Sequence, residues 1–354
     1  MGINNNLQIL RGLAASLIVL VHIEELLLKD SFPYWLSTTL FSGVDIFFVI
    51  SGFIIQKSIS NNKYTAQQFI LHRWLRVAPL YYLFTLAVFL VAYLYPALFK
   101  SSTADLSGLI NSLTFLPYEK SSGRLYPLYY VGWSLNYEMF FYLLCCVKLF
   151  FFRNSTIYFV ETVVVFLVIA GIFIPQTEIY EYFGVLGYFF TRPIMISFVF
   201  GALIARFDRY FLRLLSERLV LNCFLIVLSI GFMMASQFYF PIGGQSIFLP
   251  DTSSGYYFSI PAAVVVIAVM SIRIKRSILT EFLIKQGDAS YSMYLSHYFV
   301  IAITGVIVNR YFIEFYVLFS ILAFFVVILV SRLIYLHVEC RFSDFVKARL
   351  FGVT

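Results

Sequence analysis

Residues 7–28 read LQILRGLAASLIVLVHIEELLL, an apolar run with few polar interruptions. A helix needs about 20 such residues to cross the hydrocarbon core of a bilayer, at a rise of about 1.5 Å per residue. The run lacks the basic start and the small-residue cleavage site of a secretory signal peptide, so we expect it to remain as the first membrane span. Its length predicts a helical protein embedded in lipid.

The rest of the chain repeats this pattern. Of its 354 residues, 61% are hydrophobic and 12% are charged, whereas soluble domains average about 45–50% and about 25%. The sequence therefore predicts an all-α, polytopic transmembrane bundle that forms a single domain over residues 1–354. We expect about ten helices, near residues 7–28, 39–57, 77–98, 128–148, 157–175, 186–205, 219–236, 257–272, 290–308 and 312–336.

The basic residues are distributed unevenly between the two ends of these helices. If the N-terminus is cytoplasmic, 19 Lys and Arg residues lie on the cytoplasmic side and 5 on the other, with Arg192 near a helix end. Cytoplasmic loops of membrane proteins carry such an excess, so both termini are predicted to be cytoplasmic. The net charge of +7 then reports orientation, and we expect no nucleic-acid partner.

The four cysteines do not suggest a metal site or a disulfide framework. Cys145 and Cys146 are adjacent in one apolar stretch, Cys223 lies in another, and Cys340 follows the last. Zinc sites and disulfide-rich domains need paired spacings that this pattern lacks. No metal is expected.

Ionisable side chains inside membrane spans are costly, and each is a candidate for function or for a buried pair. Arg11 and His22 are eleven residues apart, which on an α-helix is three turns plus about 20° and about 16 Å along the axis. They should share one face, with Arg11 near the cytoplasmic surface and His22 deeper. An imidazole at that depth predicts a general base that removes a proton from a hydroxyl.

Two carboxylates could orient this imidazole. Asp45 lies near the outer end of the next predicted helix, at a depth similar to that of His22, while Glu25 follows His22 by three residues. A carboxylate holds an imidazole in one tautomer and makes it a better base. The alternative is a buried pair that only ties two helices together. We therefore predict catalytic roles for His22, Asp45 and Glu25, with the identity of the orienting acid left open.

Arg73 and Arg76 are expected to open the third predicted helix at the cytoplasmic surface. At a spacing of three residues they share one helix face, at a height similar to that of Arg11. Guanidinium groups bind phosphates in bidentate fashion, so the three arginines predict a phosphate-binding site. Ordinary anchoring by the positive-inside rule is the alternative.

Two further groups are candidates for binding a substrate. Glu138 should lie well inside the membrane on a helix that also carries Trp133 and Tyr137, and a carboxylate there needs a partner or a proton. Tyr291, Tyr294 and His297 recur at i, i+3, i+6 on one stripe of the ninth predicted helix, and Tyr291 and His297 are the candidates from it. Both groups could equally be interface aromatics or core packing.

Several short motifs, in this order, resemble the acyltransferase-3 family of membrane-bound acyltransferases. They are LRGLAA at residues 10–15 followed by His22, GVDIFFVISGF at 43–53, RWLRVAP at 73–79, GWSLNYE at 132–138 and ASYSMYLSH at 289–297. Each fragment alone is weak evidence, but their order over residues 10–297 makes the resemblance specific.

The resemblance implies a ten-helix core that transfers an acyl group, usually acetyl from cytoplasmic acetyl-CoA, to an acceptor hydroxyl, often on a sugar. Arg11 and His22 match the family's Arg–His motif, and Arg73 and Arg76 match its paired arginines. The chain is similar to short members that modify O-antigens or exopolysaccharides in bacterial inner membranes. The implied partners are acyl-CoA, a polysaccharide or lipid-linked sugar acceptor, and membrane lipids.

Three other interpretations remain open. Intramembrane His, Asp and Glu residues also build proton relays, as in a transporter or flippase of a polysaccharide precursor. The acceptor could instead be a small hydroxylated metabolite. A structural subunit would need none of these residues individually.

Overall fold

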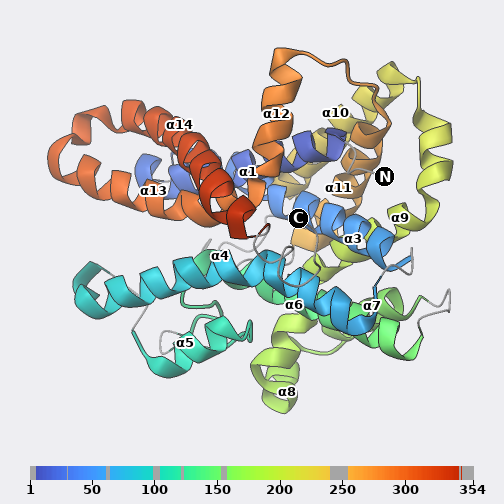
Figure 1. Ribbon diagram of the computed structural model, residues 1–354, viewed down its shortest axis with the longest axis horizontal. Coiled ribbons are helices and arrows are strands. Elements are labelled where there is room, and N and C mark those ends of the chain that lie inside the picture. Colours follow the sequence, from blue (N-terminus) through green and yellow to red (C-terminus); the bar gives the residue numbers. More distant parts are fainter. Residues whose placement is uncertain are drawn as a thin grey trace. The chain divides into compact units, whose positions relative to one another are not determined.

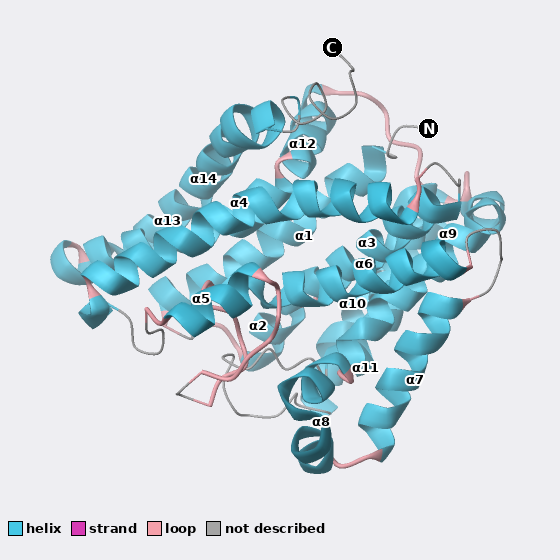
Figure 2. Ribbon diagram, turned by 60° about the horizontal axis from the view of Figure 1, so that its bottom comes forward, coloured by secondary structure: helices cyan, strands magenta, loops and turns pink. Residues whose placement is uncertain are grey.

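The computed structural model describes residues 5–29, 31–60, 64–98, 104–120, 123–152, 158–239, 254–342 and 344. Throughout these ranges the regular structure is helical and no strand is present (Figure 2). The prediction of an all-α fold is therefore confirmed.

The α-helices differ widely in length (Figure 1). They are α1 (Asn5–Ile23), α2 (Tyr34–Phe41), α3 (Gly43–Ser60), α4 (Ala66–Leu94), α5 (Leu106–Leu113), α6 (Trp133–Phe151), α7 (Phe159–Phe173), α8 (Gln176–Phe190), α9 (Ile196–Leu215), α10 (Leu219–Tyr239), α11 (Ser254–Ser271), α12 (Ile278–Asp288), α13 (Ser290–Tyr311) and α14 (Tyr316–Ile334). π-helical turns follow α1 at Glu24–Leu28 and α14 at Tyr335–Glu339.

Most of these helices meet the requirements of a membrane span. Within the described ranges, 8 helical stretches are long and apolar enough to cross a bilayer. The remaining two predicted spans correspond to shorter apolar helices, Phe159–Phe173 and Gly255–Ser271. The chain is thus a polytopic membrane protein, while the total of ten spans and the cytoplasmic termini stay predictions.

The third predicted helix begins earlier than expected. Instead of starting near residue 77, α4 starts at Ala66, because Thr65 forms a capping box with Gln68. Such a box satisfies two backbone N–H groups at a helix start. The expectation that Arg73 and Arg76 open this helix was therefore wrong, since both lie beyond its first turn.

The predicted span at 186–205 is divided. Helix α8 ends at Phe190 and α9 begins at Ile196, with a 3₁₀ turn at Pro193–Met195 between them. Arg192, before Pro193, is extended at φ −77° and ψ 143°. A proline disfavours the helical conformation in the residue before it, which explains the break.

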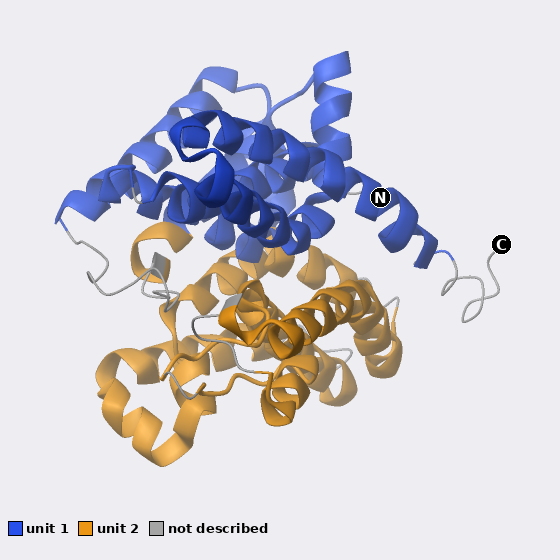
Figure 3. Cartoon of the chain, turned by 90° about the vertical axis from the view of Figure 1, so that its left-hand side faces the viewer, with its two compact units in different colours: residues 1–50, 207–241, 260–354 blue, residues 51–206, 242–259 orange. Residues whose placement is uncertain are grey.

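The helices form two compact units (Figure 3). Unit 1 comprises Met1–Ile50, Phe207–Pro241 and Ile260–Thr354, and unit 2 comprises Ser51–Arg206 and Ile242–Ser259. Several helices pass from one unit to the other. The prediction of one functional domain is not tested by this division.

In unit 1, α1 packs closely against the end of α12. A Cβ atom built on Gly287 would lie 1.8 Å from the carbonyl oxygen of Gln8, and one on Gly12 would lie 3.0 Å from the backbone nitrogen of Gly287. At the start of α1, the Asn6 amide donates hydrogen bonds to the carbonyls of Val269 (2.7 Å) and Ile272 (2.6 Å). The backbones therefore approach each other where only glycine fits.

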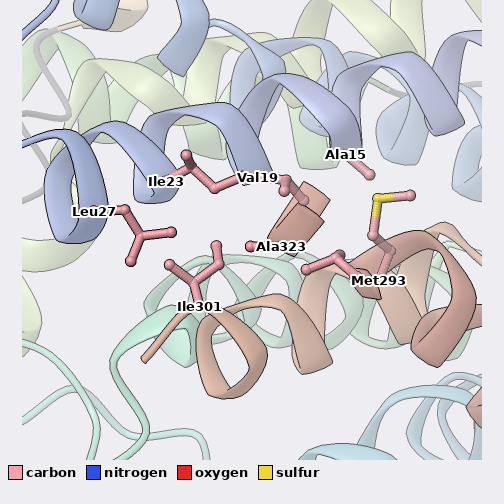
Figure 4. Close-up of a cluster of buried hydrophobic side chains, with 8 residues drawn as sticks. Ala15, Val19, Ile23, Leu27, Met293, Ile301 and Ala323 are labelled. Carbon is pink, nitrogen blue, oxygen red and sulfur yellow. The ribbon is translucent and has the colours of Figure 1, made fainter. Parts of the chain in front are cut away.

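Beyond this contact, α1 continues along α13 through an apolar seam (Figure 4). We call this the α1–α13 seam; it contains Ala15, Val19, Ile23, Leu27, Met293, Ile301, Ala323 and Val327, all buried. The four residues from α1 and its π-helical turn recur every four positions, so they form one stripe on the helix surface. This stripe faces α13 and α14.

In unit 2, close contacts also join helices that are distant in sequence. A Cβ atom on Gly52 of α3 would lie 2.2 Å from the carbonyl oxygen of Phe198 in α9. Arg206 pairs with the buried Glu161 of α7 at 2.7 Å. This pair links α7 to α9.

The α1–α12 contact makes a stability prediction. Gly287→Ala should lower the free energy of unfolding by about 1–3 kcal/mol, because the added methyl group overlaps the Gln8 carbonyl and the backbones must separate. Thermal unfolding of the purified protein in detergent would measure the loss.

Gly231→Ala in α10 is the matched control, since a Cβ there meets nothing within 4 Å. It should be neutral or slightly stabilising, because alanine favours helix over glycine by about 1 kcal/mol. Equal melting temperatures for the two variants would contradict the proposed close packing.

Candidate active site

His22 lies in the last turn of α1, where the helix widens into a π-helical turn. Its Nδ1 is 2.8 Å from Oε2 of Glu25, and both side chains are buried. π-helical turns interrupt α-helices at a cost and are frequent at functional sites. Glu25, one of the two carboxylates considered from the sequence, is therefore in hydrogen-bonding contact with this ring.

This hydrogen bond determines the chemistry available at the other ring nitrogen. A carboxylate accepts the Nδ1 proton, which leaves the lone pair of a neutral imidazole on Nε2. An imidazole held in this way can accept a proton at Nε2 while the carboxylate stabilises the positive charge that forms. His22 and Glu25 thus have the arrangement of a base and its orienting acid.

A second imidazole lies beside the first. The ring centroids of His22 and His297 are 5.1 Å apart with an angle of 31° between the planes, and the Tyr298 ring meets His22 edge-on at 5.5 Å. His297 is fully buried, and its Nδ1 is 3.2 Å from the carbonyl oxygen of Met293. The structure therefore places two predicted site residues from opposite ends of the sequence in one cluster.

The tyrosines predicted with His297 lie on the same helix. The Tyr294 ring centroid is 5.9 Å from that of His297 and 6.3 Å from that of Phe47 in α3. Tyr291 is half-buried in the first turn of α13. A substrate-binding role for Tyr291 and His297 stays a prediction.

Asp45 lies in the first turn of α3 and is fully buried. The start of this helix packs on α1, because a Cβ atom on Gly43 would lie 2.6 Å from the carbonyl oxygen of Ala14. The role of Asp45 in orienting His22 stays a prediction beside the observed contact with Glu25.

Arg11 belongs to a chain of hydrogen bonds at the beginning of α1. Its Nη1 donates to Oε1 of Gln8 at 3.0 Å, and the Gln8 amide donates to Asp288 at 2.9 Å. Arg11 is largely buried. These contacts hold the guanidinium at the α1–α12 contact, near the helix end opposite His22.

In unit 2, Arg73 and Arg76 differ in their surroundings. The Arg73 guanidinium lies over the Phe69 ring at 5.5 Å and over the Tyr142 ring at 5.8 Å, whereas Arg76 is exposed. Cations over aromatic faces gain electrostatic stabilisation. Arg73 is therefore held in place by packing, and Arg76 is open to a soluble anion such as a phosphate.

Glu138 has the partners that its position in a membrane helix requires. It accepts hydrogen bonds from the Ser51 hydroxyl at 3.2 Å and from the Tyr142 hydroxyl. Because Tyr142 also contacts Arg73, the four side chains form a polar cluster within unit 2 that joins α3, α4 and α6.

The aromatic residues predicted beside Glu138 are buried. The Tyr137 hydroxyl donates to the Phe189 carbonyl at 3.0 Å, and the two rings stack at 4.2 Å. The Trp133 ring meets Tyr137 edge-on at 6.1 Å. These contacts connect α6 to the end of α8, and binding of a substrate by Trp133 or Tyr137 stays a prediction.

Asn136 is a candidate that reasoning from the sequence missed. It is 1% exposed, and neither its amide nitrogen nor its oxygen has a hydrogen-bond partner in the described part of the chain. Burying an amide without hydrogen bonds costs about 1–3 kcal/mol. The sequence did contain a signal for this residue: Asn136 is a polar side chain between Trp133 and Glu138 in a predicted membrane span.

No metal site is evident in the part of the chain that the structure describes. There, no group of three or more His, Cys, Asp and Glu side chains is arranged to hold a metal ion. All four cysteines are free thiols.

Comparison with known proteins agrees with the family resemblance of the sequence motifs. A family model described as an acyltransferase domain matches residues 4–336, a range that includes every candidate residue. The chain is 33% identical over 269 residues to the exopolysaccharide production protein ExoZ of Rhizobium meliloti (strain 1021), covering 75% of this chain and 77% of that protein. No solved structure matches.

The Asn136 amide, which has no hydrogen-bond partner among the described residues, leads to a second stability prediction. Asn136→Leu should raise the free energy of unfolding by about 1–3 kcal/mol, because it removes a buried polar group that makes no hydrogen bond and keeps the branched shape of the side chain. Chemical or thermal unfolding in detergent would detect the gain.

Asn222→Leu serves as the control, because the buried Asn222 amide donates to the Leu215 carbonyl at 3.0 Å. That substitution should destabilise the protein. If Asn136→Leu is destabilising to the same extent, the amide has a structural partner and is not reserved for a ligand.

Proposed function

Because the chain belongs to the acyltransferase-3 family of membrane-bound O-acyltransferases, we propose that it transfers an acyl group, acetyl in the simplest case, from cytoplasmic acyl-CoA to a hydroxyl of an exopolysaccharide or its lipid-linked sugar precursor. The observation that carries the proposal is the buried His22 ring, whose Nδ1 is 2.8 Å from Oε2 of Glu25. The similarity to a protein of exopolysaccharide production supports a carbohydrate acceptor.

The reaction requires one proton acceptor. His22 Nε2 removes the proton of the acceptor hydroxyl while its oxygen attacks the thioester carbonyl carbon. The carbon–sulfur bond then breaks and CoA leaves as a thiolate, which takes the proton from the His22 imidazolium. The products are an O-acyl ester and CoA with a free thiol.

Glu25 stabilises the positive charge that forms on the His22 ring during the reaction. Its carboxylate accepts a hydrogen bond from Nδ1 throughout, so the imidazolium formed during the attack is paired with a negative charge inside an apolar environment. Asp45, which is also buried, is proposed as a second carboxylate that could orient the His22 ring.

The arginines are proposed to bind the donor. CoA carries several phosphates, and guanidinium groups recognise phosphates through paired hydrogen bonds. Arg76 is exposed, and Arg73 is held over the rings of Phe69 in the same helix and Tyr142 in α6, which suits the pair to this role. Arg11 is assigned the same role from its position in the family motif.

The remaining candidates are proposed to bind the acceptor. In unit 2 these are Glu138 and Asn136, which offer polar atoms, with Trp133 and Tyr137 beside them. In unit 1 Tyr291 and His297 are assigned the same role from the sequence. The excess of basic residues on one side supports cytoplasmic termini and a donor site that faces the cytoplasm. The family resemblance suggests that the membrane is a bacterial inner membrane.

The proposal predicts a loss of transfer when the base is removed. His22→Ala should lower the rate of transfer from radiolabelled acetyl-CoA to purified exopolysaccharide by about 10²–10⁴-fold, the usual contribution of a general base. The assay uses membranes or nanodiscs that contain equal amounts of inserted protein.

His337→Ala is the matched control, because His337 is an exposed imidazole at the end of the last helix. Its rate should be unchanged. Undiminished transfer by His22→Ala would remove His22 from the mechanism, and a wild-type protein that moves the polysaccharide precursor without consuming acetyl-CoA would favour a transporter.

The two carboxylates can be separated by amide substitutions. Glu25→Gln should lower kcat by up to about 10⁴-fold, as expected when the group that orients a catalytic imidazole loses its charge. Asp45→Asn should have a smaller effect if Glu25 is the orienting acid. A steady-state comparison of both variants with Glu24→Gln, a neighbouring buried carboxylate, would decide between them.

A larger loss of kcat in Asp45→Asn than in Glu25→Gln would assign the orienting role to Asp45. Equal and small effects of all three substitutions would mean that His22 acts without a carboxylate partner.

A further inference from the structure

Arg73 is held in the protein without the use of its hydrogen-bond donors. The guanidinium of Arg206, by comparison, is paired with the carboxylate of Glu161 at 2.7 Å. That of Arg73 lies over the Phe69 ring at 5.5 Å and over the Tyr142 ring at 5.8 Å. In the described part of the chain, no carboxylate or other acceptor takes up its N–H groups. Because a cation–π contact uses none of these groups, all five donors of this guanidinium remain for a ligand.

The two rings form a rigid support for the guanidinium. Phe69 precedes Arg73 by one turn on α4, whereas Tyr142 comes from α6. The ring centroids are 6.2 Å apart and the ring planes meet at 89°. Both residues are 1% exposed, and side chains in closely packed interiors keep their positions. The guanidinium therefore contacts two fixed, nearly perpendicular rings.

The Tyr142 ring is anchored at its hydroxyl end. The hydroxyl donates a hydrogen bond to Oε1 of Glu138, and the Ser51 hydroxyl donates to the same oxygen at 3.2 Å. A hydrogen bond to a carboxylate is strong and polarises its donor, so the ring becomes a better partner for a cation. Both contacts use Oε1, and an acceptor-binding role for Oε2 of Glu138 is compatible with them.

Arg76 lies near the same tyrosine. The Tyr142 hydroxyl interacts electrostatically with both Arg73 and Arg76, which are three residues apart on α4 and share one helix face. Arg76 is exposed. A fixed guanidinium beside an exposed one suits a ligand with several phosphates, because a preorganised group loses little conformational freedom when it binds.

We propose that Tyr142 is a positioning residue for the acyl donor. Anchored by Glu138, its ring holds the Arg73 guanidinium together with that of Phe69, and the N–H groups of Arg73 bind a phosphate group of CoA. The inference rests on the proposed acyl transfer and deepens it, because it adds residues that set the affinity for the donor. It requires no further chemical step, since the phenol, the carboxylate and the guanidinium keep their protonation states.

The test measures CoA binding and turnover separately, with the full-length protein in nanodiscs. Tyr142→Phe keeps the ring and removes the hydroxyl that anchors it. The Kd for radiolabelled CoA should rise by about three- to tenfold, the range expected when a cation–π contact is weakened. The kcat at saturating acetyl-CoA, with exopolysaccharide as acceptor, should change by less than about twofold, because the contact is the same before and during the reaction. A Kd does not depend on the fraction of folded protein.

Tyr82→Phe is the matched control. It removes a hydroxyl from α4 that donates to the Leu113 carbonyl at 2.6 Å and has no part in holding Arg73. Its Kd for CoA should equal that of the wild type. A rise as large as that of Tyr142→Phe would reflect a general effect of a lost hydroxyl and would overturn the positioning role.

A double-mutant cycle tests whether Tyr142 acts through Arg73. Arg73→Ala should itself weaken CoA binding, and adding Tyr142→Phe to it should change Kd by less than about twofold, because the group that the ring positions is already absent. Glu138→Gln keeps an oxygen that accepts from the Tyr142 hydroxyl, so its loss of CoA affinity should be no larger than that of Tyr142→Phe.

The outcomes distinguish the inference from the function on which it rests. An unchanged Kd in Tyr142→Phe, or an equal loss with and without Arg73, overturns the role of Tyr142. A larger loss in Glu138→Gln than in Tyr142→Phe also overturns it, since Glu138 would then act on the donor by another route. If Arg73→Ala binds CoA as the wild type does, the donor role of Arg73 fails as well. A wild-type protein that does not bind CoA at all would contradict the proposed function itself.

Discussion

The close approach of α1 to the end of α12 determines where the reactive groups of unit 1 lie. Gly287 leaves room for the carbonyl of Gln8. This contact sets the position of α1 along its own axis relative to α13, the helix that follows α12. The apolar stripes of the two helices then meet in the α1–α13 seam, and His22 comes to lie beside His297. A side chain on Gly287 would separate the backbones and change this register.

Within a membrane, unsatisfied polar groups carry the most information about function. Lipid offers no hydrogen bonds, so a buried polar atom must find a partner in the protein or in a ligand. Glu138 has partners within the protein in Ser51 and Tyr142. Asn136 and Nε2 of His297 have no such partners among the described residues, so their hydrogen-bonding capacity is left for a ligand.

Reasoning from helix geometry was accurate along single helices and less so between them. The spacing of His22 and Glu25 predicted their contact because both lie on consecutive turns. The start of α4 was placed about eleven residues late, because the capping box of Thr65 and Gln68 extends the helix through a more polar segment. The short helix α12 was not anticipated, since it is too short and too polar to resemble a span, although it provides Gly287 and Asp288.

The sequence by itself determined that the chain is helical, that it crosses a membrane and that it belongs to its family, because apolar run length and short motifs are local properties. Only the tertiary structure decided which nitrogen of each imidazole carries a proton and that His297 faces His22. Those facts depend on which groups from distant segments meet in the folded chain, since a tautomer is set by the partner of the opposite ring nitrogen and an unpaired atom is recognised only when its surroundings are known.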